Sequence, residues 1–227
     1  GRFAHRISES QNRNLSLAIE QYRSIVRENA GSQWAQNAYY RIGEIQLGQL
    51  FDIDEALRAY SAAVQINPES GMGHAALKRI ADCYAARGDL NEAQKTYEDV
   101  IDKAGEKESE LTLESHYQLA EIAFYRGDFN RSVEILDTLL QSVPVRNNLY
   151  NDLLTRSGFI AEHAESDSAA LALFAKGAFF ERQRDRAQAL AVYESIKERF
   201  GDTPLADDCH YRSGMLLAEM EQPEKAV

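Results

Sequence analysis

Few residues are placed to do chemistry together, and the best group lies where Asp207 and His210 flank Cys209. A carboxylate and an imidazole three residues apart share one face of a helix, and both groups bind divalent metals. Because two ligands do not make a site, we expect helix packing rather than metal binding there. The second cysteine, Cys83, is far away in the sequence, so we expect two buried thiols and neither a zinc site nor a disulfide framework.

Motifs of the common catalytic classes are absent. The sequence contains no GxxxxGK[ST], GxSxG or HExxH pattern, and its five histidines are scattered. Phosphate-loop, hydrolase and zincin chemistry therefore lack their basic parts. We expect no catalytic residue, no cofactor and no metal, which predicts a protein that is not an enzyme.

Composition excludes further classes. With 36 acidic and 25 basic residues the formal net charge is −11, and no window clusters Lys and Arg with aromatic residues, which argues against a nucleic-acid partner. The apolar runs are shorter than the roughly 20 residues that cross a bilayer, so we expect no direct membrane insertion. The abrupt beginning and end predict a piece of a longer protein.

The tripeptide Arg-Gly-Asp occurs at residues 87–89 and 126–128, either as a recognition loop or as a structural turn. Apolar residues recur at helical spacing on both sides, and Gly88 stands where a helix ends and favours the left-handed backbone. Asp89 follows as the expected N-cap of a second helix, and Glu92 completes a capping box. We therefore interpret both tripeptides as turns between helices.

Residues 74–105 resemble the tetratricopeptide repeat, a helix-turn-helix unit of about 34 residues with residue sizes fixed by position. The matching residues are Leu77, Ile80, Ala81, Tyr84, Ala93, Tyr97 and Val100. Further repeats start at Gln36, Leu113 and Ala170, with turns at Gly127 and Asp128 and at Asp185. The resemblance implies an all-α, right-handed superhelical solenoid of antiparallel helix pairs.

The repeat starts predict an N-terminal block over residues 1–146, an intervening segment over 147–167 and a C-terminal block over 168–227. The first block holds a partial repeat, matched by Ala18, Tyr22 and Ile25, and the repeats from residues 36, 74 and 113. The last block holds the repeat from residue 170 and a truncated one that reaches Ala226. Residues 147–167 form either one unpaired helix, which would bend the superhelix, or part of a divergent repeat that reuses residues 168–183.

Residues 192–226 resemble repeats of bacterial cell-envelope proteins, such as the outer-membrane assembly lipoprotein and the Tol–Pal-associated protein. The shared residues are Phe200, Thr203, Pro204, Ala206 and Asp207, whereas Gly201 replaces an expected proline and Cys209 stands near an expected alanine. The resemblance implies a bacterial protein and favours the periplasm over the cytoplasm.

By the resemblance to tetratricopeptide repeats, the first helices of the repeats line a groove that binds peptide segments or partner helices. The groove-facing positions are the second, fifth, ninth and twelfth of each repeat. The candidate partner-binding residues at these positions are Asn37, Tyr40, Glu44, Lys78, Asp82, Glu114, Tyr117, Glu121, Phe124, Leu171, Phe174, Tyr211 and Met215.

The ninth position carries Glu44, Asp82 and Glu121, and Lys78 is the single cation among the candidates. The Lys, Arg and Asn set with which chaperone-binding relatives hold an acidic C-terminus is not reproduced. Carboxylates between tyrosines instead suit a basic or aromatic partner segment. We expect a non-catalytic scaffold for protein–protein interaction, and leave open a self-associating structural module and a non-catalytic fragment of a larger enzyme or regulator.

Overall fold

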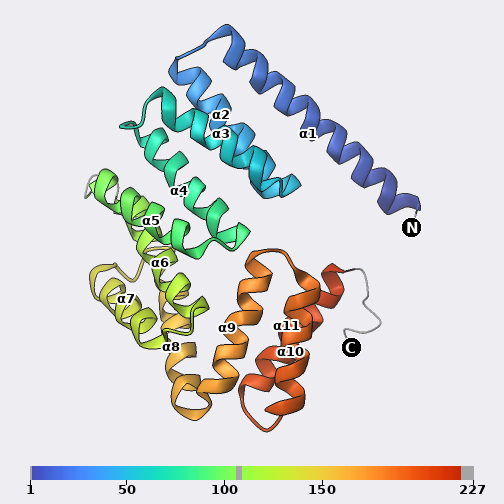
Figure 1. The fold of residues 1–227 in the computed structure, drawn as a ribbon, viewed down its shortest axis with the longest axis vertical. Helices are drawn as coiled ribbons and strands as arrows, with labels where there is room; N and C mark the ends of the chain where they lie inside the picture. Colours follow the sequence, from blue (N-terminus) through green and yellow to red (C-terminus); the bar gives the residue numbers. More distant parts are fainter. Residues whose placement is uncertain (1, 106–108, 221–227) are drawn as a thin grey trace. The chain divides into compact units, whose positions relative to one another are not determined.

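The structure is a computed structural model that describes residues 2–105 and 109–220 (Figure 1). The chain divides into two compact units, residues 1–112 (unit 1) and 113–227 (unit 2), and each is described by itself. The regular elements of the described residues are all helices, and consecutive helices pack against each other in both units. The predicted all-α class of paired helices is confirmed.

Unit 1 consists of the helix α1 and two helix pairs that follow it along the chain. Its elements are α1 (Arg2–Glu28), α2 (Gln33–Ile45), the π-helix η1 (Gln46–Leu50), α3 (Ile53–Ile66), α4 (Gly71–Arg87) and α5 (Leu90–Ala104). α1 is one continuous helix, so the partial first repeat contributes only a second helix among the described residues. α2 packs on α1 and α3, and α4 packs on α3 and α5.

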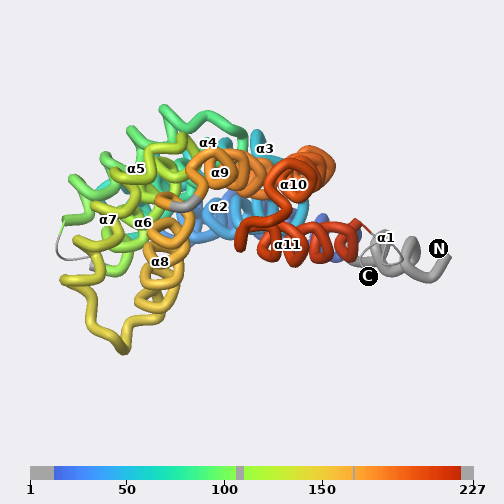
Figure 2. The backbone as a smooth tube through the Cα atoms, turned by 90° about the horizontal axis from the view of Figure 1, so that it is seen from below, coloured from blue at the N-terminus to red at the C-terminus, as the bar shows by residue number. Residues whose placement is uncertain are grey.

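Unit 2 begins within α6 (Ser109–Tyr125). The elements that follow are α7 (Phe129–Ser142), α8 (Tyr150–Ser166), α9 (Ser168–Arg182), α10 (Arg186–Arg199) and α11 (Leu205–Glu219). α8 lies beside α7 (Figure 2), and only Asp167 separates it from α9, which pairs with α10. The division into repeat blocks stays a prediction, and Ala226 lies outside the described residues.

Four turns inside the helix pairs share one backbone pattern, a left-handed residue followed by an aspartate. The left-handed residues are Phe51, Gly88, Gly127 and Arg184, with φ of 55°, 98°, 77° and 56°. The aspartates that follow are Asp52, Asp89, Asp128 and Asp185. Both Arg-Gly-Asp tripeptides therefore form turns between helices, as predicted.

The predicted N-cap at Asp89 is wrong in one respect. Its carboxylate accepts no hydrogen bond from the first turn of α5 and is bonded to Nε of Arg87 instead. The equivalent Asp128 and Asp185 do cap their helices, by accepting from the amides of Arg131 and Gln188. An adjacent guanidinium competes for the carboxylate at Asp89, because a charged donor binds it more strongly than an amide does.

Small residues let the helices of a pair approach closely, as the repeat pattern predicts. A Cβ on Gly43 would lie 2.5 Å from the ring of Tyr60, and one on Gly177 would lie 2.6 Å from the ring of Tyr193. Both tyrosines are fully buried. A larger side chain at either glycine would push its helix away from the partner helix.

Candidate functional site

A carboxylate of each first helix in unit 1 is held by a tyrosine of the second helix. The hydroxyl of Tyr60 donates to Oε1 of Glu44 at 2.6 Å, and the hydroxyl of Tyr97 donates to Oδ1 of Asp82. Burial, followed by the bond to Glu44, raises the pKa of Tyr60 far above its usual value. Tyr60 therefore stays protonated and acts as a donor.

Arg79 of α4 joins these two carboxylates across neighbouring helix pairs. Its Nε and Nη2 donate to the two carboxylate oxygens of Glu44, both at 2.8 Å, and its Nη1 donates to Oδ2 of Asp82 at 3.1 Å. Lys78 adds an ion pair to Asp82 at 3.4 Å. We call Glu44, Arg79, Asp82 and the two tyrosines bonded to them the arginine cluster; its carboxylates are already neutralised by the chain itself.

In unit 2 an arginine–glutamate pair of the same kind joins α8 to α6. Arg156 donates from Nε and Nη2 to the two oxygens of Glu121 at 2.6 and 2.8 Å, across 35 residues, the same separation as between Glu44 and Arg79. The guanidinium lies over the ring of Phe124, 4.5 Å from its centroid. α8 therefore packs on α6 as α4 packs on α2.

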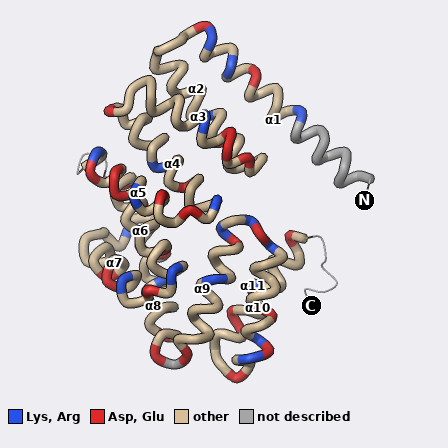
Figure 3. Tube along the Cα trace, viewed as in Figure 1, with Lys and Arg blue, Asp and Glu red and all other residues tan. Residues whose placement is uncertain are grey.

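A third version of the contact joins α9, α10 and α11. The hydroxyl of Tyr193 donates to Oε1 of Glu181, and Nη1 of Arg212 lies 3.4 Å from Oε2 of the same carboxylate. This last contact is longer than the others, and the Arg212 side chain is 45% exposed. Acidic and basic residues accordingly lie close together in both units (Figure 3).

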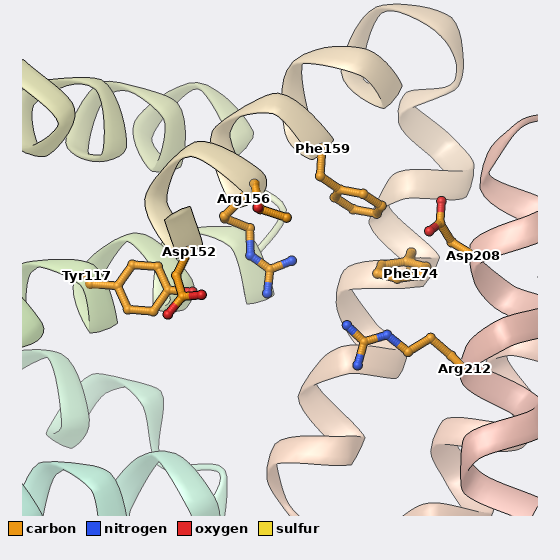
Figure 4. Close-up of a pocket in the computed structure, with 8 residues that line it drawn as sticks. Tyr117, Asp152, Arg156, Phe159, Phe174, Asp208 and Arg212 are labelled. Carbon is orange, nitrogen blue, oxygen red and sulfur yellow. The ribbon is translucent and has the colours of Figure 1, made fainter. Parts of the chain in front are cut away.

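Helices α6, α8, α9 and α11 of unit 2 line a pocket of about 260 Å³ (Figure 4). Its lining residues are Tyr117 of α6, Asp152, Thr155, Arg156 and Phe159 of α8, Phe174 of α9, and Asp208 and Arg212 of α11. The guanidinium groups of Arg156 and Arg212 point towards the space between α8 and α9. The pocket is too small for a drug-sized ligand and matches one large side chain.

Aromatic rings form the floor of this pocket. The ring centroids of Phe159 and Phe174 are 4.9 Å apart, and that of Phe174 is 5.3 Å from the ring of Tyr193. His163 meets the other side of Phe159 at 4.7 Å. Burial raises the pKa of Tyr117 to about 12, so the phenol at the rim stays neutral and can donate a hydrogen bond.

The pocket also carries two carboxylates. Asp152 is exposed and makes no ion pair within the described part of the chain. Asp208 lies 3.7 Å from Nε2 of His163, and burial raises its pKa despite the opposing effect of His163. Neither carboxylate is held by a tyrosine and an arginine as in the arginine cluster.

The predicted groove residues fall into three groups. Asp82, Glu121, Phe124, Leu171 and Phe174 are buried, so most of their surface is covered by the chain itself. Asn37, Tyr40, Glu44, Lys78, Glu114 and Tyr117 are half-buried. Tyr211 and Met215 are exposed, at 68% and 49%. Tyr117 and Phe174 come together at the pocket, while binding by any of these residues stays a prediction.

Sequence reasoning missed the arginines that pair with the carboxylates of the first helices. Arg79, Arg156 and Arg212 lie one position away from the assumed groove-facing places or on a helix without an assigned repeat. A signal was present, because Glu44 and Glu121 are each followed by an arginine 35 residues later. Looking for charges at a constant offset between repeats would have found two of the three.

Metal-binding groups do not gather in the part of the chain that the structure describes, where no three His, Cys, Asp or Glu side chains could hold an ion. Cys83 and Cys209 are both buried, as predicted, and burial raises the pKa of Cys209 to about 12. Among the described helices, none is long and apolar enough to cross a membrane.

Comparison with known proteins identifies the repeats. Residues 49–111 and 171–203 match family models of the tetratricopeptide repeat. The chain contains tetratricopeptide repeats. The two matches include the turns at Phe51, Gly88 and Arg184, so the left-handed residue before an aspartate belongs to matched repeats in both units. The cell-envelope subtype finds no support in these matches and stays a prediction.

No curated protein matches the chain. Similar solved structures include YrrB, described as a tetratricopeptide repeat protein with an unusual peptide-binding site, at 16% identity and a TM-score of 0.42 over 92% of this chain and 88% of that one. They also include BtubC (BKLC) from P. vanneervenii, at 15% identity and a TM-score of 0.46 over 96% and 86% of the two chains. Similarity this low gives no guide to the ligand.

Proposed function

We propose that the chain is a non-catalytic protein-interaction scaffold that holds a segment of a partner protein in the pocket of unit 2. Tetratricopeptide repeats bind peptides and helices on the face lined by their first helices. The observation that carries the proposal is the pocket itself, which combines an aromatic floor with polar groups from three helices, α6, α8 and α11.

The first helices of unit 1 are weaker candidates. Their ninth-position carboxylates, Glu44 and Asp82, already accept from tyrosines and from Arg79. A basic partner would have to displace these bonds before it gained any of its own. We therefore assign the basic or aromatic partner segment of the sequence prediction to unit 2.

Blocking the pocket tests the proposal. Peptides selected from a random displayed library against the intact chain would be measured by fluorescence anisotropy. Thr155→Trp fills the pocket from an exposed position on α8, whereas Ala161→Trp places the same side chain elsewhere on that helix, outside the lining. We expect Thr155→Trp to weaken binding at least tenfold and Ala161→Trp to leave it unchanged. Equal affinities of all three proteins would place the peptide elsewhere.

Self-association is the second candidate. Tyr211 and Met215 lie four residues apart on α11 and are both exposed, so they share one face of the helix. Apolar faces of terminal repeats can stack on another copy. Light scattering over a concentration series would detect a dimer, and Met215→Glu should abolish it; a constant monomeric mass would reject this candidate.

A further inference from the structure

The pocket of unit 2 contains more negative than positive charge once the groups behind its lining are counted. Arg156 is neutralised by the bidentate bond to Glu121, and Arg212 lies 3.4 Å from a carboxylate oxygen of Glu181. Asp152 and Asp208 add two further carboxylates, of which Asp208 lies 3.7 Å from Nε2 of His163. Apart from His163, four carboxylates thus surround two guanidinium groups.

The carboxylates of Asp152 and Asp208 line the pocket from different helices. Asp152 lies on α8 near Tyr117, and Asp208 lies on α11 across from Phe159 (Figure 4). In the same view the guanidinium of Arg156 lies between Asp152 and the two phenylalanine rings, so a cation placed over the rings would have Asp208 as its nearer carboxylate. Aromatic rings attract ammonium and guanidinium groups by their quadrupole, by about 0.5–2 kcal/mol depending on exposure.

An anion would find the opposite surroundings. It would approach Arg156 and Arg212, but each guanidinium already faces a carboxylate that the anion would have to displace. It would also meet the carboxylates of Asp152 and Asp208. Burial raises the pKa of Asp208 against the opposing effects of His163 and Arg212.

We propose that the pocket of unit 2 recognises the cationic side chain, arginine or lysine, of the partner segment, through Asp152, Asp208 and the rings of Phe159 and Phe174. This inference rests on the proposed function. The volume of about 260 Å³ is sufficient for one long side chain, so we expect the pocket to take a single basic residue of the segment. Backbone and neighbouring residues of the segment lie outside it.

The test uses small model compounds, so it does not depend on a selected peptide. N-acetyl-arginine methylamide is titrated into the 15N-labelled intact chain at low salt, next to the citrulline compound, which has the same shape without the charge, and the glutamate compound. We expect amide shifts in α8, α9 and α11 with arginine, at least tenfold weaker with citrulline, and none with glutamate.

Variants assign the effect to the pocket. Asp152→Asn and Asp208→Asn should each weaken arginine binding about threefold to tenfold, since one carboxylate of the pair remains, and 0.5 M salt should weaken it further. Asp202→Asn removes an exposed carboxylate outside the pocket lining and should change nothing. Chemical shifts distant from the pocket verify that each variant is folded.

Three results would overturn the inference: equal shifts with arginine and citrulline, stronger shifts with glutamate, or no shifts with arginine. If library peptides still bind and Thr155→Trp still blocks them, the proposed function survives and only the choice of a basic residue fails. If neither the library nor arginine yields binding, both proposals fail together.

Discussion

Replacing Arg79 by methionine should destabilise unit 1 by about 2–3 kcal/mol. Exposed ion pairs contribute about 0.2–1 kcal/mol, and breaking a buried pair costs about 3–5 kcal/mol. The Arg79 side chain is 32% exposed, Glu44 27% and Asp82 7%, so this site lies between the two cases and nearer the buried one. Methionine keeps most of the aliphatic packing, which confines the change to the charge and its hydrogen bonds.

Urea denaturation measures this effect. Circular dichroism at 222 nm follows all helices, and fluorescence of Trp34, the single tryptophan of the sequence, follows unit 1 alone. Both probes are needed because repeat proteins can unfold stepwise. The midpoint should fall while the slope for the Trp34 transition stays constant.

The matched control is Arg58→Met, which breaks a pair between Arg58 and Glu55 whose side chains are 66% and 38% exposed. It should cost at most about 0.5 kcal/mol. Neutralising the partners as well, in Arg79→Met with Glu44→Gln and Asp82→Asn, should recover part of the loss because no uncompensated carboxylate remains. Equal costs for Arg79→Met and Arg58→Met would show that the arginine cluster stabilises no more than a surface pair.

Three further predictions concern single contacts. Gly177→Ala should destabilise the protein by about 1–3 kcal/mol, because its Cβ would collide with the ring of Tyr193. Gly158→Ala on α8, where a Cβ would have no atom within 4 Å, should stabilise the protein by about 0.5–1 kcal/mol. Thermal unfolding compares the two variants. Asp128→Ala should cost about 1 kcal/mol as a lost N-cap, and Asp89→Ala clearly less, so equal losses in urea would contradict the assigned caps. Burial and the bond to a carboxylate raise the pKa of Tyr193. Its contribution to the free energy of unfolding is therefore complete below pH 10 and falls above pH 10 by about 1.4 kcal/mol per pH unit. Tyr193→Phe should flatten the decline in stability between pH 9 and 11.

Helical periodicity and residue size were enough to predict the helix pairs, because those signals are local. Ala81 and Ala93, for example, are fully buried where the repeat pattern requires small side chains. The left-handed turn at Arg184 was not predicted as such, because nothing in an arginine signals φ of 56°. Its conformation follows from the turn between the helices on either side, which places a left-handed residue directly before an aspartate, as at Gly88 and Gly127.

The candidate site was less predictable for a different reason. The orientation of Glu44 and Asp82 follows from their own helices, but the pairing of their carboxylates depends on Arg79, whose contacts across two helix pairs belong to the tertiary structure. The carboxylate of Asp89 likewise had two possible partners, an amide and the guanidinium of Arg87, and propensity alone does not choose between them. Sequence patterns therefore located the acidic residues and misjudged their availability.

The π-helix at Gln46–Leu50 has a consequence for how such chains change length. It lies between the contact of Gly43 with Tyr60 and the turn at Asp52, so a residue can be added or removed there while both the helix contact and the cap keep their geometry. The wider π turn accommodates one residue more than an α-helical turn does. Insertions at the end of a first helix are thereby absorbed within one repeat and need not disturb the stacking of the next, which lets repeats of unequal length share one solenoid.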